Sequence, residues 1–176
     1  STAVEPTAGA EAETATEADS AEVAALKAEV VGNYADIVYA GYQDSYDTAM
    51  ALQAALQTFV ADPNETTHQA AKDAWLAARE PYGQTEVFRF YGGPIDDEDG
   101  PEGLLNAWPL DEAYVDYVDG APDAGIINNV AEFPEITTEQ LESLNEVGAE
   151  ENISTGYHAI EFLLWGQDLS ADGNGG

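Results

Sequence analysis

Residues 20–61 decide the fold of this chain, and they read SAEVAALKAEVVGNYADIVYAGYQDSYDTAMALQAALQTFVA. Apolar and small residues recur there at steps of three and four, which is the spacing of one face of an α-helix. The stretch therefore predicts one helix from about Ser20 to Ala61, which Asp62-Pro63-Asn64 ends. A helix of this length needs partners of comparable length, so the sequence predicts an all-α, long-helix bundle. The residues of the stripe are Val23, Leu26, Val30, Tyr34, Ile37, Gly41, Ser45, Ala49, Leu52, Leu56 and Phe59.

A second helix is expected from Glu65 or Thr66 to about Phe90. Pro81 lies inside it and removes one backbone donor at a cost of ~3 kcal/mol, so we expect a kinked helix or two abutting ones. Gly41 and Ser45 are the small members of the first stripe, and they mark where another helix could approach closely. One face of the second helix carries Trp75, Arg79, Tyr82, Glu86 and Arg89.

Shorter elements complete the predicted organisation. Residues 91–103 are expected to form an acidic loop after a Gly-Gly-Pro turn. A short helix is expected after Pro109, and another over residues 138–145 with a threonine cap. The last helix is expected from about Glu150 to Trp165.

The charge of the chain is strongly unbalanced. Its 176 residues include 35 acidic and 4 basic ones, for a formal net charge of −31. Such a surface repels phosphate backbones, so we expect no nucleic-acid partner. Most of this charge is typical of a surface adapted to salt, and it favours cations as ligands. The absence of cysteine excludes disulfides and thiolate sites, and no apolar run reaches the ~20 residues of a transmembrane helix.

The candidate chemistry is concentrated at His158 and Glu161, which lie three residues apart in an apolar helical run. Positions three apart share a helix face, so the imidazole and the carboxylate can form half of a metal site, or a base and its orienting partner. The competing interpretation is a core histidine that is hydrogen-bonded to a carboxylate. The second histidine, His68, lies at the polar start of the second helix, so a multi-histidine zinc site cannot form. One histidine with carboxylates suits iron, zinc or manganese.

Glu86 and the two arginines are further candidates. Glu86 is the candidate third ligand, and Arg79 is the candidate outer partner that orients the ligands. Both lie among Trp75 and Tyr82, and polar groups among aromatic rings are expected to be partly buried and paired. Arg89 has a simpler explanation, an ion pair with Glu86 at i, i+3 that contributes ~0.2–0.5 kcal/mol.

The acidic loop and the segment after it are weaker candidates. Oxygen-rich loops suit calcium, but the spacing of residues 96–99 does not fit an EF-hand, so a solvated loop is favoured. Asp111 and Glu112 fall in the first turn of a short helix, where acids favour the helix dipole. Trp108 precedes Pro109 and is expected to be extended.

Three segments in order carry a family resemblance. The first is Trp75 to Arg79 with Pro81-Tyr82, Glu86 and Arg89-Phe90, and the second is Gly93-Pro94-Ile95-Asp96 leading into Asn106 to Glu112. The third, Gly156-Tyr157-His158-Ala159-Ile160-Glu161, is a G-x-H-x-x-E motif. Together they cover roughly residues 30–170 and resemble the imelysin family, the imelysin-like or iron-regulated proteins of bacterial envelopes.

The resemblance implies an all-helical fold of two bundle-like halves, with a site near their junction that includes His158 and Glu161. It implies a protein of the bacterial cell envelope, periplasmic or an outer-membrane lipoprotein anchored upstream of residue 1, that is associated with iron uptake. The implied ligand is a metal ion, iron first, with zinc or calcium as alternatives. The family name comes from a protease classification, but this chain has no H-E-x-x-H and we assign no catalytic residue. The residues expected to line the site are Arg79, Tyr82, Arg89, Asp96, Trp108 and Asp111.

The expected domain organisation has three parts. Residues 1–20 are expected to be a flexible Ala/Thr/Glu-rich tether, residues 21–166 the helical bundle, and residues 167–176 a glycine-rich loop. Family members continue beyond this loop, so we expect a C-terminal half, in the same protein or as a separate bound chain. Three functions remain open: an envelope protein that binds a metal for uptake, which we prefer, a peptidase, and a non-catalytic scaffold that binds a partner through the acidic face.

Overall fold

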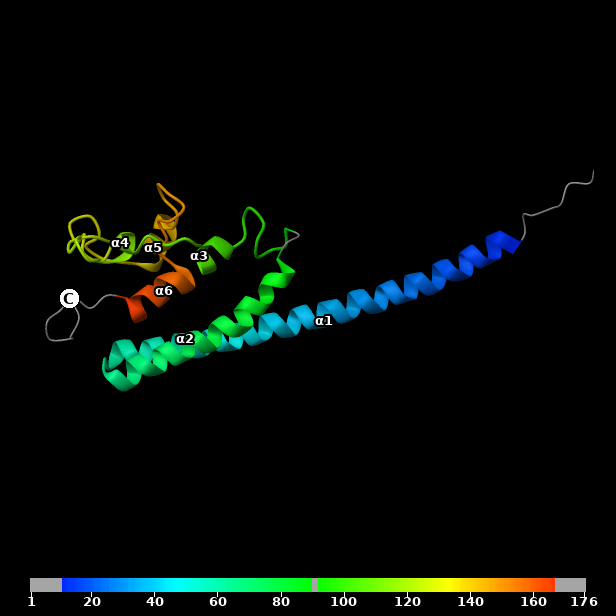
Figure 1. Ribbon diagram of the computed structural model, residues 1–176, viewed down its shortest axis with the longest axis horizontal. Helices are drawn as coiled ribbons and strands as arrows, with labels where there is room; N and C mark the ends of the chain where they lie inside the picture. Colours follow the sequence, from blue (N-terminus) through cyan, green and yellow to red (C-terminus); the bar gives the residue numbers. More distant parts are fainter. Residues whose placement is uncertain (1–10, 90–91, 167–176) are drawn as a thin grey trace, which may run out of the picture.

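The computed structural model describes residues 11–89 and 92–166, and it confirms the predicted all-α class. These residues form helices, one 3₁₀ turn and one isolated antiparallel bridge between Val118 and Ala121. Two long helices form a hairpin, the last helix packs on the second of them, and the remaining short helices lie on the far side of that last helix (Figure 1). The elements are α1 (Glu11–Ala61), α2 (Glu65–Thr85), η1 (Glu86–Phe88), α3 (Glu102–Asn106), α4 (Glu112–Val115), α5 (Thr138–Leu144) and α6 (Gly156–Trp165).

Helix α1 ends at Ala61, as predicted, but begins earlier than expected. It starts at Glu11 instead of Ser20, so the second half of the expected tether is helical. Alanine and glutamate are strong helix formers, and their abundance before Ser20 explains the extension. The first half of the expected tether, residues 1–10, lies outside the described residues.

The turn between α1 and α2 is fixed by one asparagine. The Asn64 side chain accepts hydrogen bonds from the backbone N–H groups of Thr66 and Thr67, at 3.0 and 3.1 Å. The Thr67 hydroxyl accepts a hydrogen bond from the Asn64 N–H in return, which completes a capping box. The chain therefore reverses sharply, and α2 runs back along the C-terminal part of α1.

The predicted close approach at the small residues of α1 is confirmed. Ser45 is buried, and a Cβ atom at Gly41 would lie 3.5 Å from the Phe88 ring. Between the same helices and α6 lies the main core, whose aromatic members stack edge to face or tilted. Its buried residues are Leu52, Ala71, Trp75, Ala78, Tyr82, Tyr157 and Leu164.

Helix α2 passes through Pro81 and ends at Thr85, where the 3₁₀ turn η1 follows. Figure 1 shows that the last turns of α2 bend away from α1. A proline in a helix lacks the N–H for one backbone hydrogen bond, which is a common origin of such bends. This agrees with the predicted kinked helix, and the bend turns the arginine-bearing end of α2 toward α3.

The predicted short helices after Pro109 and at residue 138 are present, but the start of α6 differs from the prediction. It begins at Gly156 and not near Glu150, because Ile153 and Ser154 are buried in non-helical backbone. The Ser154 hydroxyl donates to the Leu141 carbonyl at 2.7 Å, which holds this segment against α5. The periodicity of the sequence continues across this segment, so periodicity alone could not locate the break.

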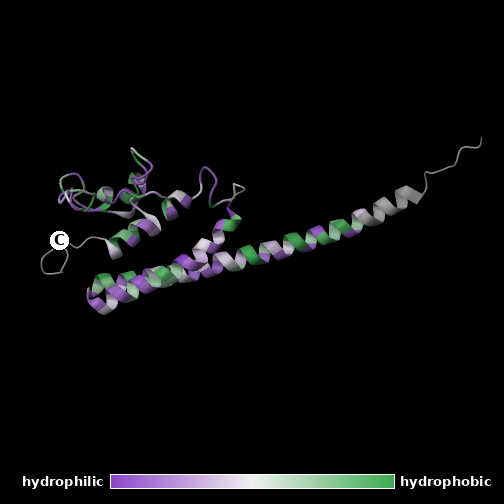
Figure 2. Ribbon diagram, in the orientation of Figure 1, coloured by the Kyte–Doolittle hydropathy of each residue, from purple (hydrophilic) through white to green (hydrophobic). Residues whose placement is uncertain are grey.

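The N-terminal part of α1 extends well beyond α2 (Figure 1). Figure 2 shows hydrophobic residues recurring along this extension. The predicted partners of comparable length are not among the described residues, since α2 has 21 residues and α1 has 51. Large side chains of the predicted stripe are therefore between 43% and 68% exposed, and they are Val23, Leu26, Val30, Tyr34 and Ile37.

Candidate functional site

The first residue of the G-x-H-x-x-E motif determines how α6 meets α3. Gly156 has a φ of +82°, and a Cβ atom there would lie 2.5 Å from the Leu105 carbonyl oxygen and 2.7 Å from that of Leu104. Thr155 donates its hydroxyl to the same Leu104 carbonyl at 2.9 Å. Only glycine permits both the left-handed backbone and this close approach. The glycine of the motif thus places the histidine helix against the end of α3.

His158 and Glu161 form the pair that the sequence predicts. Nδ1 of His158 lies 3.2 Å from a carboxylate oxygen of Glu161, one turn along α6. The His158 side chain is 16% exposed and that of Glu161 is 43% exposed, so the pair is open to solvent on the glutamate side. When Nδ1 carries the proton it donates to Glu161, and the lone pair of Nε2 becomes available to a ligand.

This pair lies in a small cleft with aromatic walls. The Trp108 ring lies 4.8 Å from the His158 ring, centroid to centroid, at an angle of 55°. The cleft has a volume of about 200 Å³ and contains two carboxylates but no lysine or arginine among its lining residues. The residues that line it are Trp108, Leu110, Glu112, His158, Glu161, Phe162, Trp165 and Gly166.

A larger groove of about 600 Å³ lies between α1 and the start of α6, but its chemistry differs. Its lining residues are apolar apart from Gln53, Gln57 and Tyr157, and they include no carboxylate or histidine. This groove offers no metal ligands, so the candidate chemistry lies in the smaller cleft.

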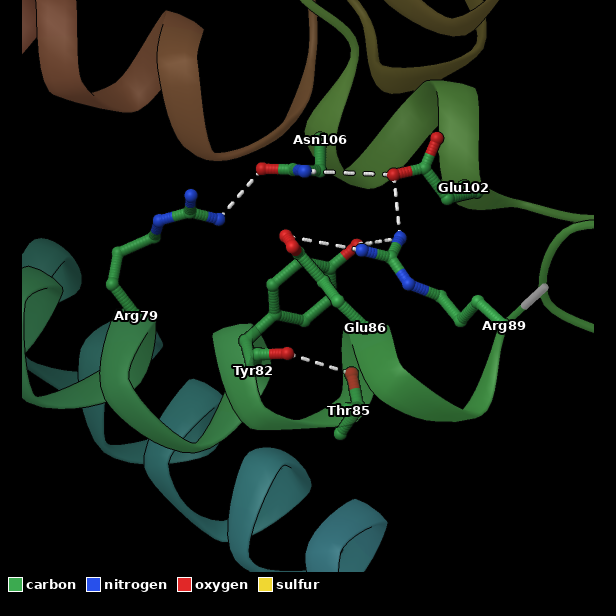
Figure 3. Close-up of polar contacts among 7 residues, drawn as sticks. All are labelled: Arg79, Tyr82, Thr85, Glu86, Arg89, Glu102 and Asn106. Carbon is green, nitrogen blue, oxygen red and sulfur yellow. Dashed lines mark hydrogen bonds and ion pairs between the residues drawn. The ribbon is translucent and has the colours of Figure 1, made fainter.

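A second group of polar residues, which we call the buried network, forms around the buried Arg89 at the end of α2 (Figure 3). The Arg89 side chain is 10% exposed and donates to Glu102 at 2.6 Å, while it pairs with Glu86 at 3.1 Å. It also donates to the Tyr82 hydroxyl at 3.3 Å. Burial alone would lower the pKa of Arg89, but the hydrogen bond to Glu102 and the nearby negative groups outweigh it and raise that pKa.

The second arginine joins this network through an amide. Arg79 donates to the Asn106 side-chain oxygen at 2.6 Å, and the Asn106 amide donates to Glu102 at 3.5 Å (Figure 3). Its guanidinium lies 5.0 to 5.8 Å from the centroids of three aromatic rings, those of Tyr157, Tyr82 and Trp75. Two arginines and two glutamates balance formally within the network, so it needs no further ion.

Burial also perturbs the tyrosine at the centre of the network. It raises the pKa of Tyr82 to about 12, because the phenolate would be desolvated. The charges of Arg89 and Arg79 oppose this rise, whereas that of Glu102 adds to it. Tyr82 therefore remains a neutral hydrogen-bonding group over the physiological range.

The comparisons with known proteins now identify the family. The family model described as Imelysin matches residues 38–175. The chain belongs to the imelysin family. The resemblance drawn from the three segments is thereby confirmed. A curated relative, Iron-regulated protein A of Synechococcus elongatus, is 30% identical over 129 residues, which cover 73% of this chain and 29% of the relative. This imelysin chain thus spans less than a third of the length of that relative.

The structure of this imelysin chain does not assemble the expected three-ligand set. Glu86 pairs with Arg89 instead of approaching His158, and residues 20–89 and 92–166 contain no group of three His, Asp or Glu side chains that could hold a metal. A carboxylate beside a buried arginine is neutralised there. The prediction that Glu86 joins His158 and Glu161 as a third metal ligand is therefore wrong for the described structure.

The remaining site residues of the sequence analysis fall in different places. Trp108 lies against His158, and its peptide bond to Pro109 is cis. Asp96 and Asp111 act locally, since each accepts a backbone hydrogen bond at 3.0 Å, from Gly93 and Ala113 respectively. Arg79, Tyr82 and Arg89 belong to the buried network.

Four residues of these two regions were missed as site residues. Glu102 and Asn106 complete the buried network, and Glu112 and Trp165 line the cleft. A signal existed for Trp165, which lies two turns after His158 and therefore on the same face of α6. For Glu102 the sequence carries no such signal, because a loop separates it from Arg89.

His68 lies outside the cleft and has a structural role. Its Nε2 lies 2.8 Å from the Leu164 carbonyl oxygen, and its ring stacks on Phe59 at 5.0 Å. It ties the start of α2 to the end of α6. None of the helices among the described residues is both long enough and apolar enough to cross a lipid bilayer.

Proposed function

We propose that this imelysin chain binds a metal ion at the His158–Glu161 pair, with iron as the preferred ion. The chain would do so as part of a bacterial envelope protein that serves iron uptake. The observation that carries the proposal is the pairing of these side chains at 3.2 Å in an acidic cleft without a basic lining residue. Imidazole nitrogen with carboxylate oxygen suits iron, zinc or manganese, and carboxylates alone suit calcium. Iron takes precedence because the curated relative is named as iron-regulated.

The described residues would supply only part of the coordination. His158 would donate through one ring nitrogen, and Glu161 would either coordinate the ion directly or fix the ring orientation through Nδ1. A bound ion would act there as a Lewis acid or as transported cargo. Solvent, a chelating ligand or the remainder of the protein would supply the other donors.

A metal titration of the full-length protein tests the proposal. His158→Phe removes the nitrogen donor and preserves a ring beside Trp108, so we expect the affinity for Fe²⁺ or Mn²⁺ to fall at least tenfold by calorimetry. His68→Phe is the matched control, because that histidine contacts Leu164 and Phe59 and lies outside the cleft. Equal affinity in the wild type and His158→Phe would reject the site.

We also propose that a C-terminal half packs on α1. The relative is much longer than the matched region, and the stripe on the α1 extension is exposed. In the full-length protein, amide hydrogens of residues 23–37 should then exchange more slowly than in the 176-residue chain. Equal exchange in the two proteins would contradict this arrangement.

A peptidase activity is the second candidate, because the family model carries a peptidase designation. It would require hydrolysis of peptides by the full-length protein that disappears in His158→Phe or with a chelator. Hydrolysis that survives both changes would place the activity elsewhere. Inactivity on varied peptides would remove this candidate while leaving the metal titration unaffected.

A further inference from the structure

The cleft beside His158 combines exposed tryptophans with carboxylates. Trp108 is 68% exposed and Trp165 is 43% exposed, although each ring already contacts one aromatic neighbour. Tryptophan is highly buried on average, so two exposed rings in one cleft are unusual. Glu112 and Glu161 supply the charge of the same cleft. A metal ion would use the carboxylates but would leave the aromatic walls unexplained.

Aromatic faces with nearby carboxylates favour a cation that also has apolar surface. The face of an indole ring attracts a cation within about 6 Å, and this attraction strengthens when the cation is poorly hydrated. Alkylammonium groups meet both conditions, because their charge is spread over methyl or methylene surface. The volume of about 200 Å³ suits a small ligand of this class, since drug-sized ligands occupy about 300 Å³ or more.

One ring of the cleft already accepts a cation from the chain itself. Lys72 Nζ lies 5.3 Å from the centroid of the Trp165 ring. The Trp165 ring therefore already takes part in a cation–π interaction, which leaves the Trp108 ring as the principal surface for an added cation. In addition, the formal net charge of −31 raises the local concentration of any small cation around the molecule.

We propose that the cleft binds a small organic cation of the alkylammonium class against Trp108 and Trp165, with Glu112 and Glu161 as its counter-charges. This site shares Glu161 and the cleft with the metal proposal, but it requires ring faces and carboxylates and no donor nitrogen from His158. Trp108 is the residue with the largest available ring surface, so it should determine the affinity.

Calorimetry on the 176-residue chain with choline tests this site. The neutral isostere 3,3-dimethylbutan-1-ol has the same shape without the charge, and we expect it to bind at least fivefold more weakly. Trp108→Leu should weaken choline binding about three- to tenfold, whereas Tyr39→Leu, which removes a 72% exposed ring from α1, should not change it.

The outcomes separate this site from the metal site. Choline binding should be unchanged when a chelator such as EDTA is present, whereas the chelator would abolish the metal binding expected above. The absence of saturable choline binding would overturn the proposal. Equal binding of choline and its neutral isostere, or an unchanged affinity in Trp108→Leu, would overturn it as well.

Discussion

At the scale of single residues, Arg89 organises the end of α2. It holds two glutamates that differ in exposure, since the side chain of Glu102 is 32% exposed and that of Glu86 is 47% exposed. Their ion-pair distances to Arg89 also differ, at 2.6 Å for Glu102 and 3.1 Å for Glu86. The closer and more buried glutamate contributes more to stability, because solvent screens its attraction to the guanidinium less. The two positions therefore provide a matched pair of substitutions around one guanidinium.

We predict that Glu102→Gln lowers the free energy of unfolding by about 1–2 kcal/mol, because Arg89 loses its closest charged acceptor in a buried position. Glu86→Gln should cost less than about 0.5 kcal/mol, since that pair is half-exposed and spans one turn. Urea denaturation of the two variants measures the difference. A larger loss for Glu86→Gln would show that Glu102 does not dominate the network.

The raised pKa of Tyr82 leads us to predict a loss of stability at high pH. Its pKa is about 12 in the folded chain and about 10 when unfolded, so folding favours the protonated phenol. The unfolded chain binds fewer protons between these values, and the stability that is present below pH 10 falls as the pH rises toward about 12. Tyr82→Phe should remove this part of the alkaline loss. The same slope of stability against pH in both proteins would contradict the role of Tyr82.

The sequence could predict local pairs but not distant ones. The contact of His158 with Glu161 and that of Glu86 with Arg89 both follow from three-residue spacing on a helical turn. The contact of Glu102 with Arg89 depends on how the intervening loop folds, and the cleft depends on how residues 106–112 approach α6. Tertiary packing sets both, so helical spacing could not reveal them.

At the scale of the elements, Gly156 is the point on which the placement of α6 depends. The start of α6 was predicted too early because Gly156 interrupts an apolar pattern that continues on both sides of it. The start of α1 was predicted too late because a region without large side chains is still rich in helix-forming alanine and glutamate. Apolar periodicity therefore predicted the existence and the packed faces of the long helices more accurately than their boundaries.

Gly156→Ala should lower the free energy of unfolding by about 2–4 kcal/mol, because the new Cβ would strain a left-handed residue and meet two carbonyl oxygens. Gly83→Ala is the control, since its Cβ would meet nothing within 4 Å and alanine favours the helix. That control should leave stability unchanged or raise it by up to about 1 kcal/mol. Thermal or urea unfolding compares them, and equal effects would reject the proposed constraint at Gly156.

Two leucines of the α1 stripe should differ strongly in how much each contributes to the free energy of unfolding. Leu52 is 4% exposed in the core, so Leu52→Ala should cost about 2–4 kcal/mol. Leu26 is 54% exposed on the extension, so Leu26→Ala should cost less than about 0.5 kcal/mol in the 176-residue chain. A large cost at Leu26 would mean that the extension is covered even in this chain.

At the scale of the whole molecule, the large negative charge is the main electrostatic influence on stability. A formal net charge of −31 produces self-repulsion that opposes folding, and the described arginine and lysine side chains provide two ion pairs to offset it, both from Arg89. We predict that the urea midpoint rises as KCl is increased from about 10 mM to 1 M, because salt screens the repulsion. An unchanged or lower midpoint would indicate that the ion pairs outweigh the repulsion.

The position of the tryptophans gives the molecule a built-in optical signal. Trp75 is buried, whereas Trp108 and Trp165 both line the cleft, and Trp108 touches the imidazole of His158. Two of the three indoles in the chain therefore respond to the same small volume. The unlabelled protein should therefore report a ligand that enters this cleft through its own fluorescence.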